Sequence, residues 1–239
     1  MLSLVTLALA PGIAIACYIY CKDKYDREPV AALTTAFVLG ALCIIPAIVI
    51  QRALLPLLTR HSDIYSLKYY LVWAFGVVAI SEEGCKFMAL RLYAYRNKAF
   101  DEPFDGIVYS VMVGMGFATV ENVLYVTNSG ITTGIIRMFL SVPAHASFAV
   151  LMGYHVGMAK FNTRRPVLHM IKGILLAVFF HGAYDFFLFI QNNPNATKYV
   201  STGLLVAGAL LTYGIAVRMA LKAIRLHQEL SKQAFFNTL

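Results

Sequence analysis

Apolar runs long enough to cross a bilayer fill almost this whole sequence and constrain its fold more than any other feature. Apolar residues make up 59% of the chain and charged residues only 13%, which is too little polar surface to enclose a water-soluble core. About 20 helical residues reach across the hydrocarbon core. The runs predict about seven membrane-spanning helices, at residues 2–20, 31–54, 68–92, 104–127, 135–159, 167–190 and 200–220.

Only short polar connections separate these runs, so we expect one all-α domain over residues 1–239, a polytopic helical bundle in the cell membrane. Loops are predicted around Pro56–Ser66 and at a Gly/Thr-rich turn near Asn128–Gly134. Residues 220–239 mix Leu, Ile and Phe with Lys and Arg. This tail fits an amphipathic helix on the cytoplasmic surface and, equally, a solvated end.

The net charge of +8 comes from Lys and Arg residues scattered between the apolar runs. They form no basic face interleaved with aromatic residues, so nucleic acid is not an expected partner, and the lipid bilayer is. Lys and Arg concentrate in alternate connections, which predicts an outside N-terminus and a cytoplasmic C-terminus. The four cysteines lie in or at the end of apolar runs, unlike a disulfide framework.

Ionisable residues interrupt the third apolar run in the stretch ISEEGCK, from Ile80 to Lys86. Such groups are costly inside a membrane and tend to be paired and functional. Glu82 and Lys86 lie one helical turn apart on one face, and Glu83 points about 100° away. Lys86 can therefore pair with Glu82 and leave Glu83 free, or pair with Glu83 and leave Glu82 free for reaction.

Polar residues recur in the next three apolar runs at a similar depth. Glu121 and Asn122 lie near the exit of the fourth run, and His145 lies in the fifth. The sixth carries His181 and Asp185, one turn apart, so the carboxylate can fix the imidazole tautomer. Alternate helices run in opposite directions, which brings these residues into one layer between mid-membrane and the outer surface. We expect a functional polar chamber there.

Four motifs in these runs together resemble the PrsW family of intramembrane proteases. They are the EExxK of Glu82–Lys86, the stretch FDGIVYSVMVGMGFATVEN of Phe104–Asn122, His145, and the HGAYD of His181–Asp185. The family is similar in turn to the CAAX-protease and Abi superfamily. The order and spacing of the motifs favour PrsW over prenyl-protein processing.

The resemblance implies regulated intramembrane proteolysis, in which a membrane-anchored protein substrate is cut. In the best-known branch of the family that substrate is an anti-sigma factor, cleaved on its extracytoplasmic side. The predicted orientation agrees, since the chamber lies nearer the outer surface. The sequence does not indicate the substrate or the oligomeric state.

No serine or cysteine has a recognisable base partner, so direct attack by water on the peptide bond is expected. In one version of the reaction Glu82 or Glu83 takes the proton of the water with help from His145. His181, oriented by Asp185, then donates to the oxyanion.

In the other version zinc activates the water. His145 and His181, with Glu121 or Glu83, are the candidate ligands, because two histidines and a carboxylate form a known catalytic zinc set. Lys86 and Asn122 are supporting residues in both versions.

Two functions from other classes also fit the composition. An ion- or proton-coupled transporter uses buried Glu, His and Asp in a similar way, but the two halves of this chain show no repeat. A catalytically inactive scaffold is less favoured, because both glutamates and both histidines are present.

Overall fold

The computed structural model describes residues 2–161 and 164–237, and the described chain is helical with short connections. The expected all-α class is therefore confirmed. The helices are α1 (Leu2–Lys22), α2 (Val30–Leu42), α3 (Ile44–His61), α4 (Leu67–Leu71), η1 (Val72–Ala79), α5 (Ile80–Leu92), η2 (Ala94–Arg96), α6 (Asp105–Phe139), α7 (Ser141–Phe161), α8 (Pro166–Phe189), η3 (Ile190–Asn192), α9 (Pro194–Thr197) and α10 (Thr202–Asn237).

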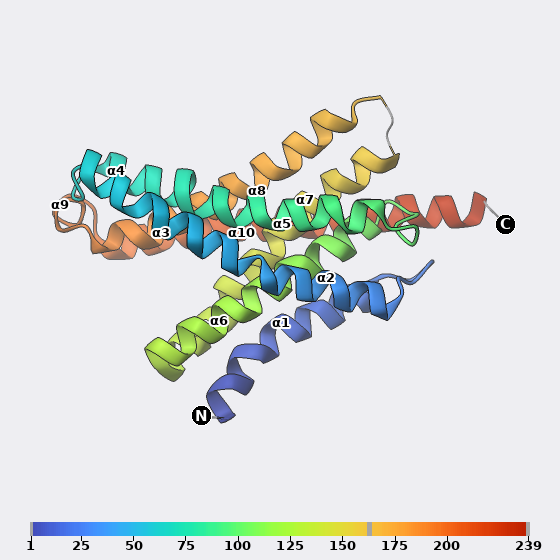
Figure 1. The fold of residues 1–239 in the computed structure, drawn as a ribbon, viewed down its shortest axis with the longest axis horizontal. Helices are drawn as coiled ribbons and strands as arrows, with labels where there is room; N and C mark the ends of the chain where they lie inside the picture. The colour runs from blue at the N-terminus through green and yellow to red at the C-terminus, as the bar shows by residue number, and fades with distance from the viewer. Residues whose placement is uncertain (1, 162–163, 238–239) are drawn as a thin grey trace.

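The first part of α6 forms the centre of the bundle, where it packs against α1, α2 and α7 (Figure 1). Every residue from Asp105 to Thr119 is buried. A helix that is buried on all sides must let its neighbours approach closely, and Gly106 provides such a contact. A Cβ added there would lie 2.6 Å from the backbone nitrogen of Gly157 on α7. Glycines of α6 and α7 thus allow the two helices to pack closely.

The chain reverses direction at Gly130, which has φ 82° and ψ −170° within α6. This positive φ suits glycine, which has no Cβ to clash. Contacts across the reversal show two antiparallel arms, since Arg137 reaches back to Asn122 and a Cβ at Gly134 would meet Val126. The turn predicted near Asn128–Gly134 is therefore confirmed. We call this unit, from Asp105 to Phe161, the central hairpin.

The second helical unit is longer than predicted and bent. Its two parts, α2 and α3, meet at Cys43, and Pro46 in the next turn cannot donate a backbone hydrogen bond to the preceding turn. The prediction that a loop begins at Pro56 is wrong, because α3 continues through Pro56 to His61. The residues of this last part are mostly exposed, so the carbonyl that Pro56 leaves without a partner is not buried.

The third helical unit runs without interruption from α4 through η1 to α5. The eight residues of η1, Val72–Ala79, are π-helical, with wider turns than an α-helix, and they lie directly before Ile80. Such segments are rare and occur frequently at functional sites. Here the π-helical segment ends three residues before Glu82.

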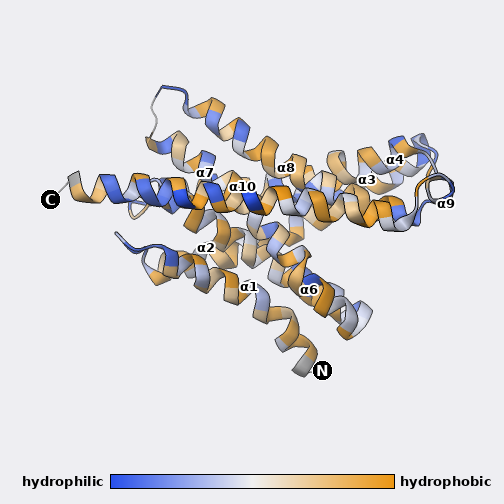
Figure 2. Cartoon of the chain, turned by 180° about the vertical axis from the view of Figure 1, so that it is seen from behind, coloured by the Kyte–Doolittle hydropathy of each residue, from blue (hydrophilic) through white to orange (hydrophobic). Residues whose placement is uncertain are grey.

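The C-terminal helix, α10, is a single helix that includes the predicted seventh span and most of residues 220–239. Figure 2 shows its first half mainly hydrophobic and its second half with many hydrophilic residues. Ala220, Ile224, His227 and Ser231 of the second half are buried at helical spacing, so this face packs against the protein.

Five segments of the described chain are long and apolar enough to cross a membrane, which makes this a multi-pass membrane protein. They are Leu4–Lys22, Val30–His61, Asp105–Phe161, Pro166–Asn192 and Thr202–Phe236. Asp105–Phe161 is the central hairpin and contains two helical arms. The unit from Leu67 to Leu92 is not among the five, and it carries the charges of ISEEGCK. The count of seven spans stays a prediction.

Candidate active site

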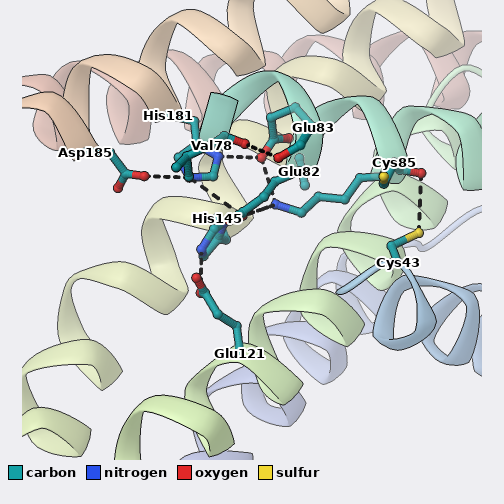
Figure 3. A network of polar contacts seen from close by, with 12 residues as sticks. Cys43, Val78, Glu82, Glu83, Cys85, Glu121, His145, His181 and Asp185 are labelled. Atoms are coloured by element: carbon teal, nitrogen blue, oxygen red, sulfur yellow. Dashed lines mark hydrogen bonds and ion pairs between the residues drawn. The ribbon is translucent and has the colours of Figure 1, made fainter. Parts of the chain in front are cut away.

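Side chains from α5, α8 and the central hairpin meet in one buried network (Figure 3). The network contains Glu82, Glu83 and Lys86 of α5, Glu121 and Arg137 of α6, His145 of α7, and His181 and Asp185 of α8. All the catalytic candidates predicted from the sequence lie in it. The neighbouring Phe148 stacks on the His181 ring, with centroids 5.3 Å apart.

Lys86 lies between the two glutamates and is closer to Glu83. Its Nζ is 2.7 Å from Glu83 Oε1 and 3.6 Å from Glu82 Oε2. It also lies 3.3 Å from His145 Nδ1 and above the Phe117 ring, 4.0 Å from the centroid. An ammonium group can only donate, so His145 Nδ1 accepts this hydrogen bond. The second of the two ion-pair arrangements, with Glu83 bound and Glu82 freer, is thus the one observed.

His145 is held from its other side by Glu121. The distance from His145 Nε2 to Glu121 Oε2 is 3.0 Å, and a carboxylate can only accept, so Nε2 carries the proton. Arg137 Nη2 donates to the same carboxylate oxygen at 2.6 Å, and Arg137 Nε donates to Asn122 Oδ1 at 3.0 Å. Asn122 in turn donates to the carbonyl of Ala8 on α1 at 2.9 Å. This chain of contacts fixes the ring of His145.

His181 has a carboxylate at each ring nitrogen. Its Nδ1 lies 2.8 Å from Glu83 Oε1, and its Nε2 lies 3.2 Å from Asp185 Oδ2 and 3.8 Å from Glu82 Oε2. The pairing with Asp185 at i and i+4 follows the expectation from the sequence. Gly182 brings α8 close to η1, since a Cβ there would lie 2.7 Å from Phe75 Cγ. This close approach holds His181 beside Glu83.

Glu82 is the glutamate that faces open space. A cavity of about 430 Å³ is lined by Glu82, His145, His181, Glu121 and Asp185 together with Arg137 and apolar side chains, whereas Glu83 does not line it. Gln51 of α3 donates to Glu82 Oε1 at 3.2 Å. The other oxygen, Oε2, is buried and receives no hydrogen bond from the described chain. Glu82 therefore presents an unfilled oxygen at the cavity.

The donor atoms of Glu82, His145 and His181 fit a metal ion. One ligand atom from each lies within 4.8 Å of the others, and all three residues are buried. The four carboxylates of the network exceed its two cations, Lys86 and Arg137, by two formal charges when both imidazoles are neutral. A divalent cation would balance this excess and fill the open position at Glu82 Oε2.

Glu121, which the sequence places among the candidate ligands, lies outside this group of three donors. Arg137 holds its carboxylate, and it contacts the outer nitrogen of His145. Histidine ligands commonly donate their other ring N–H to a carboxylate in this way. Glu121 thus has the position of a residue that orients a ligand.

Arg137 of the network, and Gln51, which donates to Glu82, are absent from the site predicted from the sequence. Each is a polar residue at or inside an apolar run, and this position is the feature of the sequence that could have identified it as a site residue. His155 and His169 contact each other, with their Nδ1 atoms 3.4 Å apart, and neither lines the cavity.

Comparison with known proteins identifies relatives over most of the chain. Residues 28–224 match the family model described as "PrsW family intramembrane metalloprotease". "Protease PrsW" of Geobacillus kaustophilus (strain HTA426) is 38% identical over 188 residues, which cover 79% of this chain and 80% of that protein. "Protease PrsW" of Bacillus subtilis (strain 168) is 34% identical over 194 residues, or 81% and 86% of the two chains. No solved structure matches.

Proposed function

We propose that this chain, which belongs to the PrsW family of intramembrane metalloproteases, hydrolyses a peptide bond of a membrane-tethered protein at the Glu82 cavity. The observation that carries the proposal is the cavity itself, which brings two histidines and an unfilled carboxylate oxygen together between apolar helices. An anti-sigma factor is the substrate type that the family resemblance suggests.

Glu82, His145 and His181 are the residues that would hold the metal, with zinc as the proposed ion. At His145 Nδ1 the metal would replace the hydrogen bond from Lys86. Zinc held there would lower the pKa of a water molecule to about 7 and polarise the scissile carbonyl. The remaining residues act on the ligands. Glu121 accepts from His145, and Glu83 accepts from His181, so both rings keep one orientation.

The chain also provides groups for the leaving amine and the oxyanion. Asp185 lines the cavity, and its carboxyl group can pass a proton to the departing amine. Arg137 lines the same cavity and adds positive charge where the oxyanion would develop. Lys86 and Phe117 close the inner side of the site.

We propose an orientation with the N-terminus outside and the C-terminus in the cytoplasm. Glu121 precedes the reversal at Gly130 by nine residues, or about 14 Å, so the cavity lies nearer that end of the hairpin. The basic residues after α1 and in the second half of α10 lie at the other end. Cleavage would then occur towards the extracytoplasmic side. Reporter fusions to the C-terminus test this orientation.

The function is tested with purified protein in detergent and a single-span substrate. We expect Glu82→Gln and His181→Ala to lose cleavage while they keep the wild-type unfolding temperature to within a few degrees. His169→Ala is the matched control, because this histidine lies away from the cavity, and it should cleave normally. Full cleavage by both site variants would exclude this cavity as the active site.

The zinc content of Glu82→Gln separates two roles for Glu82. If Glu82 is a ligand, the variant should retain far less zinc than the wild type. If Glu82 takes the proton from the water, the variant should bind zinc normally and still fail to cleave. Chelation of the wild type should abolish cleavage in both cases, and undiminished activity with less than about 0.1 zinc per chain would rule zinc out.

A further inference from the structure

A second group of buried carboxyl groups lies around the start of α6. Gly130 and the reversal lie at the opposite end of this arm of the central hairpin. Asp23 follows α1, Glu28 and Glu102 lie in connections, and Asp105 begins α6. Their exposed fractions are 0%, 3%, 6% and 1%. One carboxylate oxygen each from Asp23, Glu102 and Asp105 lies within 4.8 Å of the others. We call these four residues the acidic cluster.

Three of the four carboxylates are fixed through one oxygen. Asp23 Oδ2 accepts the backbone N–H of Glu28 at 3.1 Å, and Asp105 Oδ2 accepts that of Glu102 at 2.7 Å. Glu28 Oε2 accepts the hydroxyl of the buried Tyr109. One oxygen of every member, however, is buried without a hydrogen-bond partner in the described chain. The cluster therefore presents four unfilled oxygens, and three of these belong to carboxylates that are already oriented.

Within residues 2–161 and 164–237, no basic side chain forms an ion pair with the acidic cluster. The nearby basic groups bind backbone carbonyls, and their charges act on the cluster only from a distance. Arg27 Nε donates to the backbone carbonyl of Asp23, and Lys160 Nζ donates to the carbonyls of Tyr95 and Asn97. Several buried, unpaired carboxylates cost several kcal/mol each, so the cluster requires a bound cation or bound protons.

We propose that the acidic cluster is a binding site for a hard divalent cation, Ca²⁺ or Mg²⁺. Its donors are all oxygens, which suit these ions, whereas the Glu82 cavity offers the nitrogen-rich set that suits zinc. Calcium–oxygen distances are about 2.3–2.6 Å, so ligand oxygens on opposite sides of one ion lie about 5 Å apart. The oxygens of Asp23, Glu102 and Asp105, all within 4.8 Å of one another, are near enough to share one ion. The hydrogen bonds to Asp23 Oδ2 and Asp105 Oδ2 orient these two carboxylates, as hydrogen bonds do around bound metals.

The position of the acidic cluster indicates what the cation would do. The ion would join the end of α1 to the start of α6, next to the point where Phe104 donates to Ser231 of α10 at 3.1 Å. Asp105 and Glu121 are 16 residues apart on α6, or about 24 Å, so the ion takes no part in peptide cleavage. It would stabilise the packing of three helix ends.

The proposal is tested by cation binding to the full chain in detergent. The protein is first stripped with chelator, and all samples carry His181→Ala so that the Glu82 cavity contributes little. At about 1 mM Ca²⁺ or Mg²⁺ we expect about one equivalent bound and a higher unfolding temperature. Asp23→Asn and Glu102→Gln should each weaken binding at least about tenfold. Glu229→Gln, an exposed residue of α10, is the control and should bind normally.

Protons are the competing occupants. Burial raises the pKa of Asp23 to about 6 and those of Glu28 and Glu102 to about 7. If protons alone fill the cluster, neither cation will bind at this concentration, and the amide variants will be stabilised whether or not a cation is present. Either result overturns the proposal, as does a cation affinity in both amide variants equal to that of His181→Ala alone.

Discussion

Arg137 should be essential for the position of His145, although it is far from the EExxK motif in the sequence. Its guanidinium holds Glu121 at 2.6 Å and Asn122 at 3.0 Å, and Glu121 holds the ring of His145. In Arg137→Met the Glu121 carboxylate loses its cation while it stays mostly buried. It must then take up a proton or turn away, and in both cases the hydrogen bond that fixes His145 changes.

The expected loss of stability follows from the burial of this pair. Removing one partner of a fully buried ion pair costs about 3–5 kcal/mol. The side chains of Arg137 and Glu121 retain 12% and 15% exposure, so we expect the lower part of that range or slightly less, about 2–3 kcal/mol. For a chain of this size that corresponds to a decrease of about 4–12 °C in Tm.

The expected loss of activity is larger than the stability change explains. Partners that orient a metal ligand are worth about 10- to 100-fold, so kcat/KM for a single-span substrate should fall by that factor below the melting range. Arg137→Lys should be intermediate, because one ammonium cannot bind Glu121 and Asn122 in the same fork.

The assay compares cleavage and thermal unfolding of the purified variants in the same detergent. Arg52→Met is the matched control, since Arg52 is exposed on α3 and its loss removes the same charge without touching the network. If Arg137→Met cleaves at the wild-type rate and melts within about 1 °C of the wild type, the positioning role is refuted.

Two further substitutions test the packing of the site. Lys86→Met leaves Glu83 without its 2.7 Å partner, so the free energy of unfolding of the chelated protein should fall by about 3–5 kcal/mol. Added metal should restore part of this loss. Equal unfolding temperatures for the variant and the wild type would contradict this expectation. In Gly153→Ala the new Cβ would lie 2.7 Å from Ser110 Cβ, which should force α7 away from α6 and cost about 1–3 kcal/mol in chemical unfolding. The control Gly214→Ala has open space and should be neutral or gain up to about 1 kcal/mol, so equal effects of the two glycine changes would disprove the packing argument.

Much of the site could be predicted because polar residues are conspicuous in apolar runs. Glu82, Glu83, His145 and His181 each interrupt a stretch that otherwise fits lipid, and the structure brings them together. The family resemblance, based on four motifs, is confirmed by the match over residues 28–224. The turn at Gly130 was also predictable, because its composition disfavours a continuous helix.

Other features depend on packing that one sequence does not contain. The arrangement of Glu82 and Glu83 around Lys86 involves partners from other helices, since His181 contacts Glu83 and Gln51 donates to Glu82. The loop expected at Pro56 failed because an exposed helix can continue past a proline without burying the free carbonyl. The contact between Arg137 and Glu121 depends on the hairpin, which brings together two residues 16 positions apart.

The central hairpin also determines the order in which the site can assemble during synthesis. The bonds that join Glu121 to Arg137 and His145 span only 16 and 24 residues, so they can form soon after the hairpin leaves the ribosome. The bond from His181 to Glu83 spans 98 residues and must wait for α8. A nascent chain therefore holds an oriented His145 but an incomplete set of metal donors. Proteolytic competence arises late in biogenesis, once most of the protein is in the membrane.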